Sequence, residues 1–231
     1  MKIITRGEKK FVFKTCHCDE AYRRNEVAFS RLGQQMDIRV AKNEHGQLGF
    51  LKGIYSEYFL QPDERVAWLV DYVLLGALGA ERFQQVPIDR AIKACRDKFG
   101  ENLHPDFVTN FVETYLFSVL VGNGDHNFTG KANLEITKNK KTKLINMATY
   151  HDFELTTHDT TSKRCEEINH EILGGYKKNI GILRADHKQI HEKFLDNAAC
   201  ADLDCLDCTE VMRRNIEKQV EYMMDFTSRD K

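Results

Sequence analysis

Residues 122–136 read Gly-Asn-Gly-Asp-His-Asn-Phe-Thr-Gly-Lys-Ala-Asn-Leu-Glu-Ile, and they separate an apolar helical pattern from a polar hairpin pattern. Gly, Asn and Asp tolerate positive φ or form local side-chain bonds, so the first four residues alone predict a turn. Before this turn, the apolar residues of 106–120 recur at helical spacing and predict the most buried helix. After it, residues 133–137 and 142–149 predict two strands around the lysine-rich turn 138–141.

The chain ahead of this region alternates between extended and helical patterns. We expect two short strands, a helix capped by Asp19 and two further extended stretches, at 2–4, 11–15, 19–35, 37–42 and 48–60. Gly46 and Gly49 mark turns in the last of these regions.

Beyond Pro62 the pattern becomes helical. Asp63 is a plausible cap for a helix over 63–79, Pro87 opens a second helix that ends near Phe99, and further helices are predicted at 163–173, 184–199 and 209–226. The sequence therefore predicts an α+β fold. Its sheet-rich N-terminal part would occupy residues 1–61, and a larger helical part with the embedded hairpin would occupy 62–231.

Composition excludes several classes of protein. The 231 residues carry 34 Lys and Arg against 35 Asp and Glu, so no general electrostatic attraction to nucleic acid is expected. Four lysines around residue 140 are typical of a solvated hairpin tip. No apolar stretch reaches the roughly 18 residues that a spanning helix needs, and the first residues are not those of a signal peptide. We expect a soluble, cytoplasmic protein, with secretion as an effector as the alternative setting.

Seven cysteines are scattered along the chain, and free thiols are the default expectation for this number in a reducing compartment. One group includes a Cys-x-x-Cys pair: Cys200, Cys205 and Cys208, with His191 as a fourth candidate zinc ligand. There is no second pair at zinc-knuckle spacing, so this remains the minor alternative.

Two carboxylates are placed where they could serve phosphoryl transfer. Asp125 lies on the glycine-rich turn and Asp152 follows the hairpin in the run Tyr-His-Asp-Phe-Glu. Phosphoryl transfer needs an acidic residue that orients the attacking hydroxyl and oxygen ligands that hold magnesium on the phosphates. Asp125 suits the first task. Asp152, with Asn133 or Asn127, suits the second.

The stretch from Leu116 to Glu154 resembles the catalytic core of HipA-type serine/threonine kinases, which are distantly similar to phosphoinositide kinases. The resemblance rests on Gly-Asn-Gly-Asp at 122–125, the following Asn and the Tyr-His-Asp-Phe motif at 150–153. It implies a protein-kinase-like two-lobed fold, with ATP and Mg²⁺ as cofactors. Asp125 would be the catalytic residue, and Asn133 and Asp152 the metal ligands, with Asn127 as the alternative.

The resemblance extends to the N-terminal part of the chain. Lys14, on Phe-Val-Phe-Lys-Thr, is similar to the strand lysine that holds the ATP phosphates, and Glu26 to the helix glutamate that steadies it. Tyr58 and Phe59 occupy the position of the segment that presents backbone groups to adenine, and Val12 is a candidate contact for the ring. The resemblance also implies a protein substrate and, for relatives that are toxins, an antitoxin or another small partner subunit.

Three other functions use overlapping residues. A pseudokinase or nucleotide-binding module is favoured by the single glycine of the turn at 5–10 and by the unusual spacing from Asp125 to Asn133. A small-molecule or lipid kinase would use the same catalytic residues. A metal-dependent hydrolase would use His126 and His151 together with the two aspartates.

Overall fold

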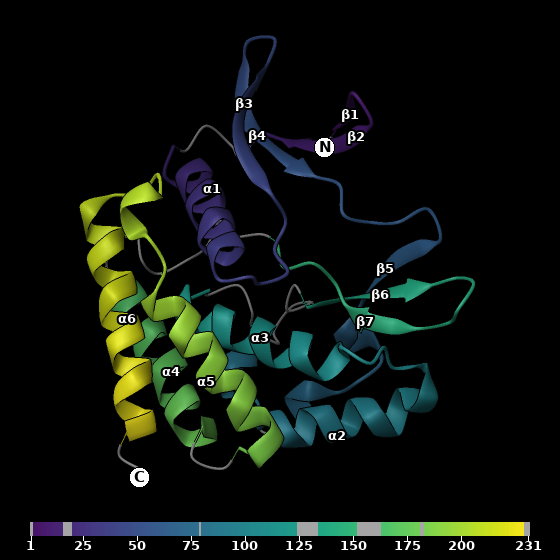
Figure 1. The fold of residues 1–231 in the computed structure, drawn as a ribbon, viewed down its shortest axis with the longest axis vertical. Helices are drawn as coiled ribbons and strands as arrows, with labels where there is room; N and C mark the ends of the chain where they lie inside the picture. Colours follow the sequence, from purple (N-terminus) through teal and green to yellow (C-terminus); the bar gives the residue numbers. More distant parts are fainter. Residues whose placement is uncertain are drawn as a thin grey trace.

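The computed structural model describes residues 2–15, 20–78, 80–123, 134–151, 163–180 and 183–228. It contains two antiparallel sheets and, over these ranges, six α-helices, with the larger sheet at one end of the molecule and most helices at the other (Figure 1). No helix in the described ranges has the length and apolar character needed to cross a membrane.

The N-terminal sheet has the strand order β1-β2-β4-β3. Its strands are β1 (Lys2–Arg6), β2 (Lys9–Lys14), β3 (Asn43–Leu48) and β4 (Leu51–Glu57), and helix α1 (Glu20–Gln35) joins β2 to β3. The strands predicted at 2–4 and 11–15 and the helix at 19–35 are confirmed. The extended stretch predicted at 37–42 is wrong as a strand, because this segment has only an isolated bridge from Val40 to Tyr150 and β3 begins at Asn43.

Gly46 does not mark a turn as predicted, because it lies inside β3 opposite Gly53. A Cβ atom at this position would overlap the ring of Tyr55. That ring is held between the Arg6 guanidinium, 3.7 Å from its centroid, and Phe13 at 5.0 Å. The true turn of the hairpin is at Gly49, whose φ is +62°.

A Gly46→Ala substitution should destabilise the protein by about 1–3 kcal/mol, because Tyr55 cannot move aside without leaving Arg6 and Phe13. Urea unfolding measures this change. Gly174→Ala is the matched control. A Cβ at this helical position meets no atom within 4 Å, so the free energy of unfolding should be unchanged or slightly higher. Equal effects of the two substitutions would contradict the packing explanation.

The second sheet has the order β5-β6-β7 and corrects the helix predicted at 63–79. Its strands are β5 (Glu64–Trp68), β6 (Glu135–Asn139) and β7 (Ile145–Met147), and short 3₁₀ turns at Leu69–Asp71 and Leu75–Leu78 follow β5. Val66 pairs with Thr137, so contact with a distant strand overrides the local helical pattern. Of the apolar residues that suggested a helix, Leu69 and Leu75 are buried from the two 3₁₀ turns and Val73 is buried from the segment between them.

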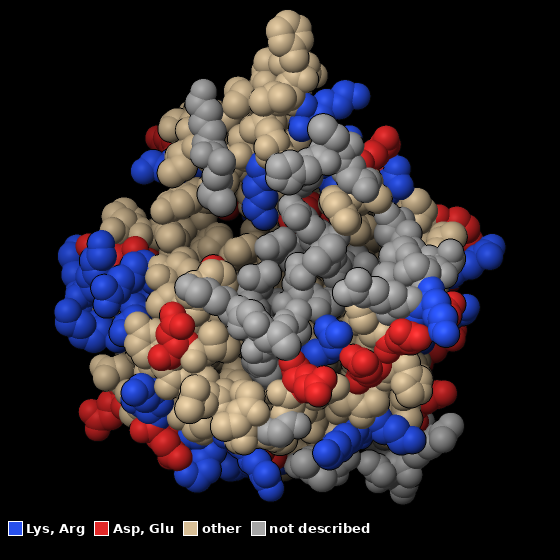
Figure 2. Space-filling view, turned by 180° about the vertical axis from the view of Figure 1, so that it is seen from behind, with Lys and Arg blue, Asp and Glu red and all other residues tan. Residues whose placement is uncertain are grey.

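The hairpin predicted around 138–141 is confirmed, with its turn shifted to residues 140–144. Lys140, Lys141 and Lys143 of this turn are exposed, as predicted for a solvated tip. Figure 2 shows a group of basic side chains at the edge of the molecule where this turn projects.

Five further helices complete the structure: α2 (Ile88–Phe99), α3 (Phe107–Leu120), α4 (Lys163–Ile180), α5 (Ala185–Ala199) and α6 (Glu210–Ser228). The helices predicted in these regions are confirmed, and α4 is longer than predicted. Helix α3 lies at the centre, and Phe111, Tyr115 and Leu116 are completely buried. The main hydrophobic cluster also includes Phe29 and Leu32 of α1, so this helix packs on the helical part as well as on the N-terminal sheet.

Candidate functional site

Lys14 lies at the end of β2, and its Nζ is 3.4 Å from Oε1 of Glu26 on α1. The Lys14 side chain is 20% exposed and that of Glu26 is fully buried. The register of β2 places Lys14 and Val12 on the face of the sheet turned toward α1, with Phe13 on the opposite face. The structure therefore brings together the lysine and glutamate that the sequence analysis paired.

Glu26 is held by a network of buried hydrogen bonds. The Asn43 side chain donates 2.7 Å to Oε2 of Glu26 and 3.1 Å to its carbonyl oxygen. Asn43 is fixed in turn, because its N–H donates 2.9 Å to Oγ of Ser30, which donates 2.6 Å to the carbonyl of Ala41. A carboxylate fixed in this way can hold an ammonium group in one position, since the hydrogen bonds from Asn43 set the rotamer of the carboxylate. Sequence reasoning missed Asn43, because nothing in its neighbourhood marks a partner 17 positions away.

Tyr58 and Phe59 follow β4, where the chain leaves the N-terminal sheet. The N–H of Tyr58 donates 2.8 Å to the carbonyl of Lys10, so this donor is occupied within the sheet and is not free for an adenine base. The Phe59 ring stacks on His151, with centroids 5.6 Å apart and an interplanar angle of 30°. Phe59 thus lies against the residue that directly precedes Asp152.

The two candidate catalytic segments begin side by side. Helix α3 ends at Leu120, and Asn123 is 1% exposed. Its Nδ2 donates 3.0 Å to the hydroxyl of Tyr150, and its carbonyl accepts 2.8 Å from Nε2 of Gln84. Asp125 comes two residues after Asn123, and Asp152 comes two residues after Tyr150. The candidate residues Asp125, His126, Asn127, Asn133 and Asp152 themselves lie outside the described residues.

Glu135 and His151 form a second polar contact between the two candidate segments. His151 Nε2 is 2.9 Å from Oε2 of Glu135, and the side chains are 25% and 13% exposed. Glu135 is two residues after Asn133, and His151 is next to Asp152, so this contact joins the end of the first candidate segment to the beginning of the second.

The possible zinc ligands do not form a site. Nowhere in the described ranges, which include Cys200, Cys205, Cys208 and His191, are three His, Cys, Asp or Glu side chains grouped to hold a metal ion. His191 is buried and lies 2.7 Å from the hydroxyl of Tyr176.

Gln84→Met should lower the free energy of unfolding by about 2 kcal/mol, because Met keeps the side-chain volume but removes buried hydrogen bonds. The Gln84 Nε2 donates both to Asn123 and, at 2.5 Å, to Oγ of Ser118. We also expect faster proteolysis between residues 123 and 134, measured by limited digestion and mass spectrometry. Gln61→Met, at an exposed position, is the control, and the prediction is wrong if both variants are cleaved alike.

Comparison with solved structures identifies the architecture. The fold is similar to that of the proinflammatory kinase CtkA from Helicobacter pylori, with a TM-score of 0.54 at 8% sequence identity over 96% of this chain and 89% of that chain. HipA from Shewanella oneidensis MR-1, solved as a toxin–antitoxin complex with HipB and operator DNA, gives a TM-score of 0.40 at 11% identity and covers 99% of this chain and 62% of that one. No protein-family model and no curated protein sequence matches the chain. The likeness to CtkA establishes the fold, which is the two-lobed kinase-like α+β fold predicted from the sequence.

Proposed function

We propose that this chain is a Mg-ATP-dependent kinase that transfers the γ-phosphoryl group of ATP to a serine or threonine hydroxyl of a protein. The observation that carries the proposal is the Lys14–Glu26 pair, held by Asn43 on the inner face of a sheet in a kinase-like fold. A fixed ammonium group at this place suits the phosphates of ATP, because it supplies charge without a cost of reorganisation.

The remaining roles follow from chain connectivity. The Asn123–Tyr150 hydrogen bond fixes two points that are each two residues from an aspartate. Two residues span about 7 Å at most, so chain connectivity allows Asp125 and Asp152 to act on one phosphate group. Asp125 would orient the acceptor hydroxyl and accept its proton.

Magnesium fits the donor set. Asp152 and Asn133, or Asn127 in its place, offer carboxylate and amide oxygens, the ligands that Mg²⁺ prefers. When bound, the ion neutralises charge on the phosphates. His151 contacts Glu135 and Phe59, which sets the position of the main chain just ahead of Asp152.

The experiment is incorporation of ³²P from γ-labelled ATP into the protein itself and into a general acceptor such as myelin basic protein, with Mg²⁺ or with EDTA. We expect magnesium-dependent incorporation that phosphoamino-acid analysis assigns to Ser or Thr. Incorporation that EDTA leaves unchanged, or its complete absence with several acceptors, overturns the proposal.

A nucleotide-binding pseudokinase is the second candidate, and one observation favours it. The β1–β2 connection is a tight turn at Gly7 and Glu8, between Arg6 and Lys9, which is short for a loop that covers phosphates. Under this alternative, Mg-ATP would raise the melting temperature while no phosphate is transferred to any acceptor.

A further inference from the structure

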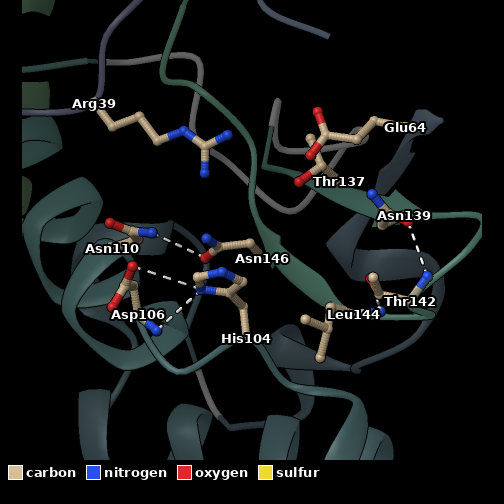
Figure 3. Close-up of a pocket in the computed structure, with 10 residues that line it drawn as sticks. All are labelled: Arg39, Glu64, His104, Asp106, Asn110, Thr137, Asn139, Thr142, Leu144 and Asn146. Atoms are coloured by element: carbon tan, nitrogen blue, oxygen red, sulfur yellow. Dashed lines mark hydrogen bonds and ion pairs between the residues drawn. The ribbon is translucent and has the colours of Figure 1, made fainter. Parts of the chain in front are cut away.

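A polar cavity of about 480 Å³ lies between the β5-β6-β7 sheet and the beginning of α3, and none of its lining has been given a role so far (Figure 3). Its walls carry three amide side chains, of Asn110, Asn139 and Asn146, and the hydroxyl of Thr137. Figure 3 shows Arg39 reaching into it from one side and Glu64 standing at the opposite side. The volume is within the range of pockets that hold a specific ligand.

The amide groups of the cavity match a peptide main chain. Nδ2 of Asn110 donates 2.9 Å to Oδ1 of Asn146. This pairing leaves Oδ1 of Asn110 and Nδ2 of Asn146 without a hydrogen bond to any described residue. This acceptor and this donor, on two paired side chains, can complement the N–H and C=O of one residue of an extended peptide, because those two groups point to the same side of the chain.

Arg39 adds a fixed positive charge. Its Nε donates 3.3 Å to Oγ1 of Thr149, and Nη1 donates 3.2 Å to the carbonyl of Met147. Within the described ranges its Nη2 makes no hydrogen bond and the guanidinium has no carboxylate partner. An arginine held in this way is suited to receive a carboxylate, since its orientation is already set.

The two acidic residues of the cavity, Glu64 and Asp106, form no ion pair with Arg39. Oδ2 of Asp106 is 3.6 Å from Nδ1 of His104, and Oε2 of Glu64 accepts 3.1 Å from the N–H of Gln61. Both carboxylates are therefore engaged away from the guanidinium.

The cavity is connected along the chain to the residues of the proposed phosphoryl-transfer site. The carbonyl of Arg39 accepts 2.9 Å from the N–H of Tyr150, and Asp152 is two residues farther along. On the neighbouring strand, Thr137 comes four residues after Asn133, which corresponds to roughly 13 Å of extended chain. These short chain separations allow a short extended peptide to reach from the proposed acceptor position into the cavity.

We propose that this cavity binds the polypeptide segment that flanks the phosphorylated residue of a protein substrate, and that Arg39 binds an Asp or Glu side chain of that segment. The acidic residue would lie about three to five positions from the Ser or Thr, given the rise of an extended chain. Asn110 and Asn146 pair with the main chain of the peptide and so set its register. Arg39 selects for an acidic side chain at one position. This inference deepens the proposed kinase function and rests on it for the identity of the ligand.

The test is peptide binding without ATP. The probes are fluorescent peptides with a central Ser and degenerate flanks, in which each position in turn is fixed as Glu, Gln or Lys, and affinity is measured by fluorescence polarisation. For the wild-type protein we expect Glu to be preferred over Gln by about fivefold or more at one flanking position. The Arg39→Gln variant should lose this preference, because Gln can still donate to Thr149 or Met147 but carries no charge.

Arg65→Gln is the matched control. Arg65 is exposed on β5 and pairs with Lys138, on the face of the sheet away from Thr137, so its loss removes a nearby charge outside the cavity. Retention of the Glu preference in this variant, together with its loss in Arg39→Gln, supports the proposal. The proposal is overturned if the wild type shows no preference for Glu at any position. It is also overturned if the Glu preference survives Arg39→Gln, because the lysine turn would then be its source.

The two proposals can fail separately. Peptide binding needs no phosphoryl transfer, so a Glu preference that depends on Arg39 supports this inference even if labelled phosphate is never incorporated. Magnesium-dependent phosphorylation with no role of Arg39 in peptide binding would support the kinase and overturn the docking site.

Discussion

Phosphoryl transfer by a Lys14→Met variant should fall about 100- to 1000-fold, the range found when one preorganised charge-stabilising group is removed. Met keeps the length of the side chain but supplies no charge to the phosphates. The measurement is the initial rate of ³²P incorporation at saturating Mg-ATP, normalised to folded protein by circular dichroism. We expect the loss in kcat, because the lysine acts on the charge that develops in the transition state.

Two further variants separate catalysis from stability. Lys14→Met leaves the buried Glu26 without its lysine, which lowers stability in its own right. The double variant Lys14→Met/Glu26→Gln removes both charges, so stability should return while transfer remains lost. Lys9→Met is the matched control on the same strand, since Lys9 pairs with Glu57 at an exposed site and its loss should leave the rate unchanged. A wild-type rate of phosphoryl transfer in Lys14→Met would show that Lys14 has no role in catalysis.

Acid should destabilise the protein through His191. Burial lowers the pKa of His191 from 6.5 to about 4, because a charged imidazole is disfavoured in the core, where the ring packs on Tyr176. Below pH 6.5 the unfolded chain binds a proton that the native state refuses, so stability is lost as pH falls from 6.5 toward 4. The loss at pH 4.5 should be about 2–3 kcal/mol. Urea unfolding at pH 7 and at pH 4.5 measures it.

The His191→Gln variant should show a smaller loss of stability between these two pH values, because Gln does not titrate and can still bond to the Tyr176 hydroxyl. His170→Gln, at an exposed position of α4, is the control, and its loss of stability between the two pH values should equal that of the wild type. The other titratable groups are the same in both proteins. If all three proteins lose the same stability, His191 is protonated in the native state and the prediction is wrong.

Most elements could be predicted because their periodicity is local. The apolar stripe of α3 and the alternation of β2 each arise within one element, so the sequence reveals them without knowledge of the partner. The segment 63–79 could not be predicted in this way. This segment forms a strand and two 3₁₀ turns, and the strand that pairs with β5 is β6, which lies 67 to 75 residues farther along the chain.

The candidate site was predicted in part. The order of Lys14 and Glu26 along the chain was enough to pair them, and the structure brings them together. Asn43 was missed because an isolated Asn forms no recognisable sequence pattern. The N–H of Tyr58 is bonded to the carbonyl of Lys10, and the contact of Tyr58 and Phe59 with adenine stays a prediction. The roles of Asp125, Asn127, Asn133 and Asp152 remain predictions from motif and connectivity.

Helix α1 is attached to the C-terminal part of the chain by reciprocal bonds. Gln35 donates 3.2 Å to the carbonyl of Asp202 and accepts 2.8 Å from its N–H, and Asn197 donates 2.9 Å to the carbonyl of Met36. Helix α1 therefore contacts the C-terminal helices through its last turn, and it contacts the N-terminal sheet through Glu26, which bonds to Asn43 of β3 and Lys14 of β2. The same helix thus connects the ion pair of the N-terminal sheet to the C-terminal part of the chain. The last third of the sequence carries none of the catalytic motif, yet it fixes the end of the helix on which Glu26 lies.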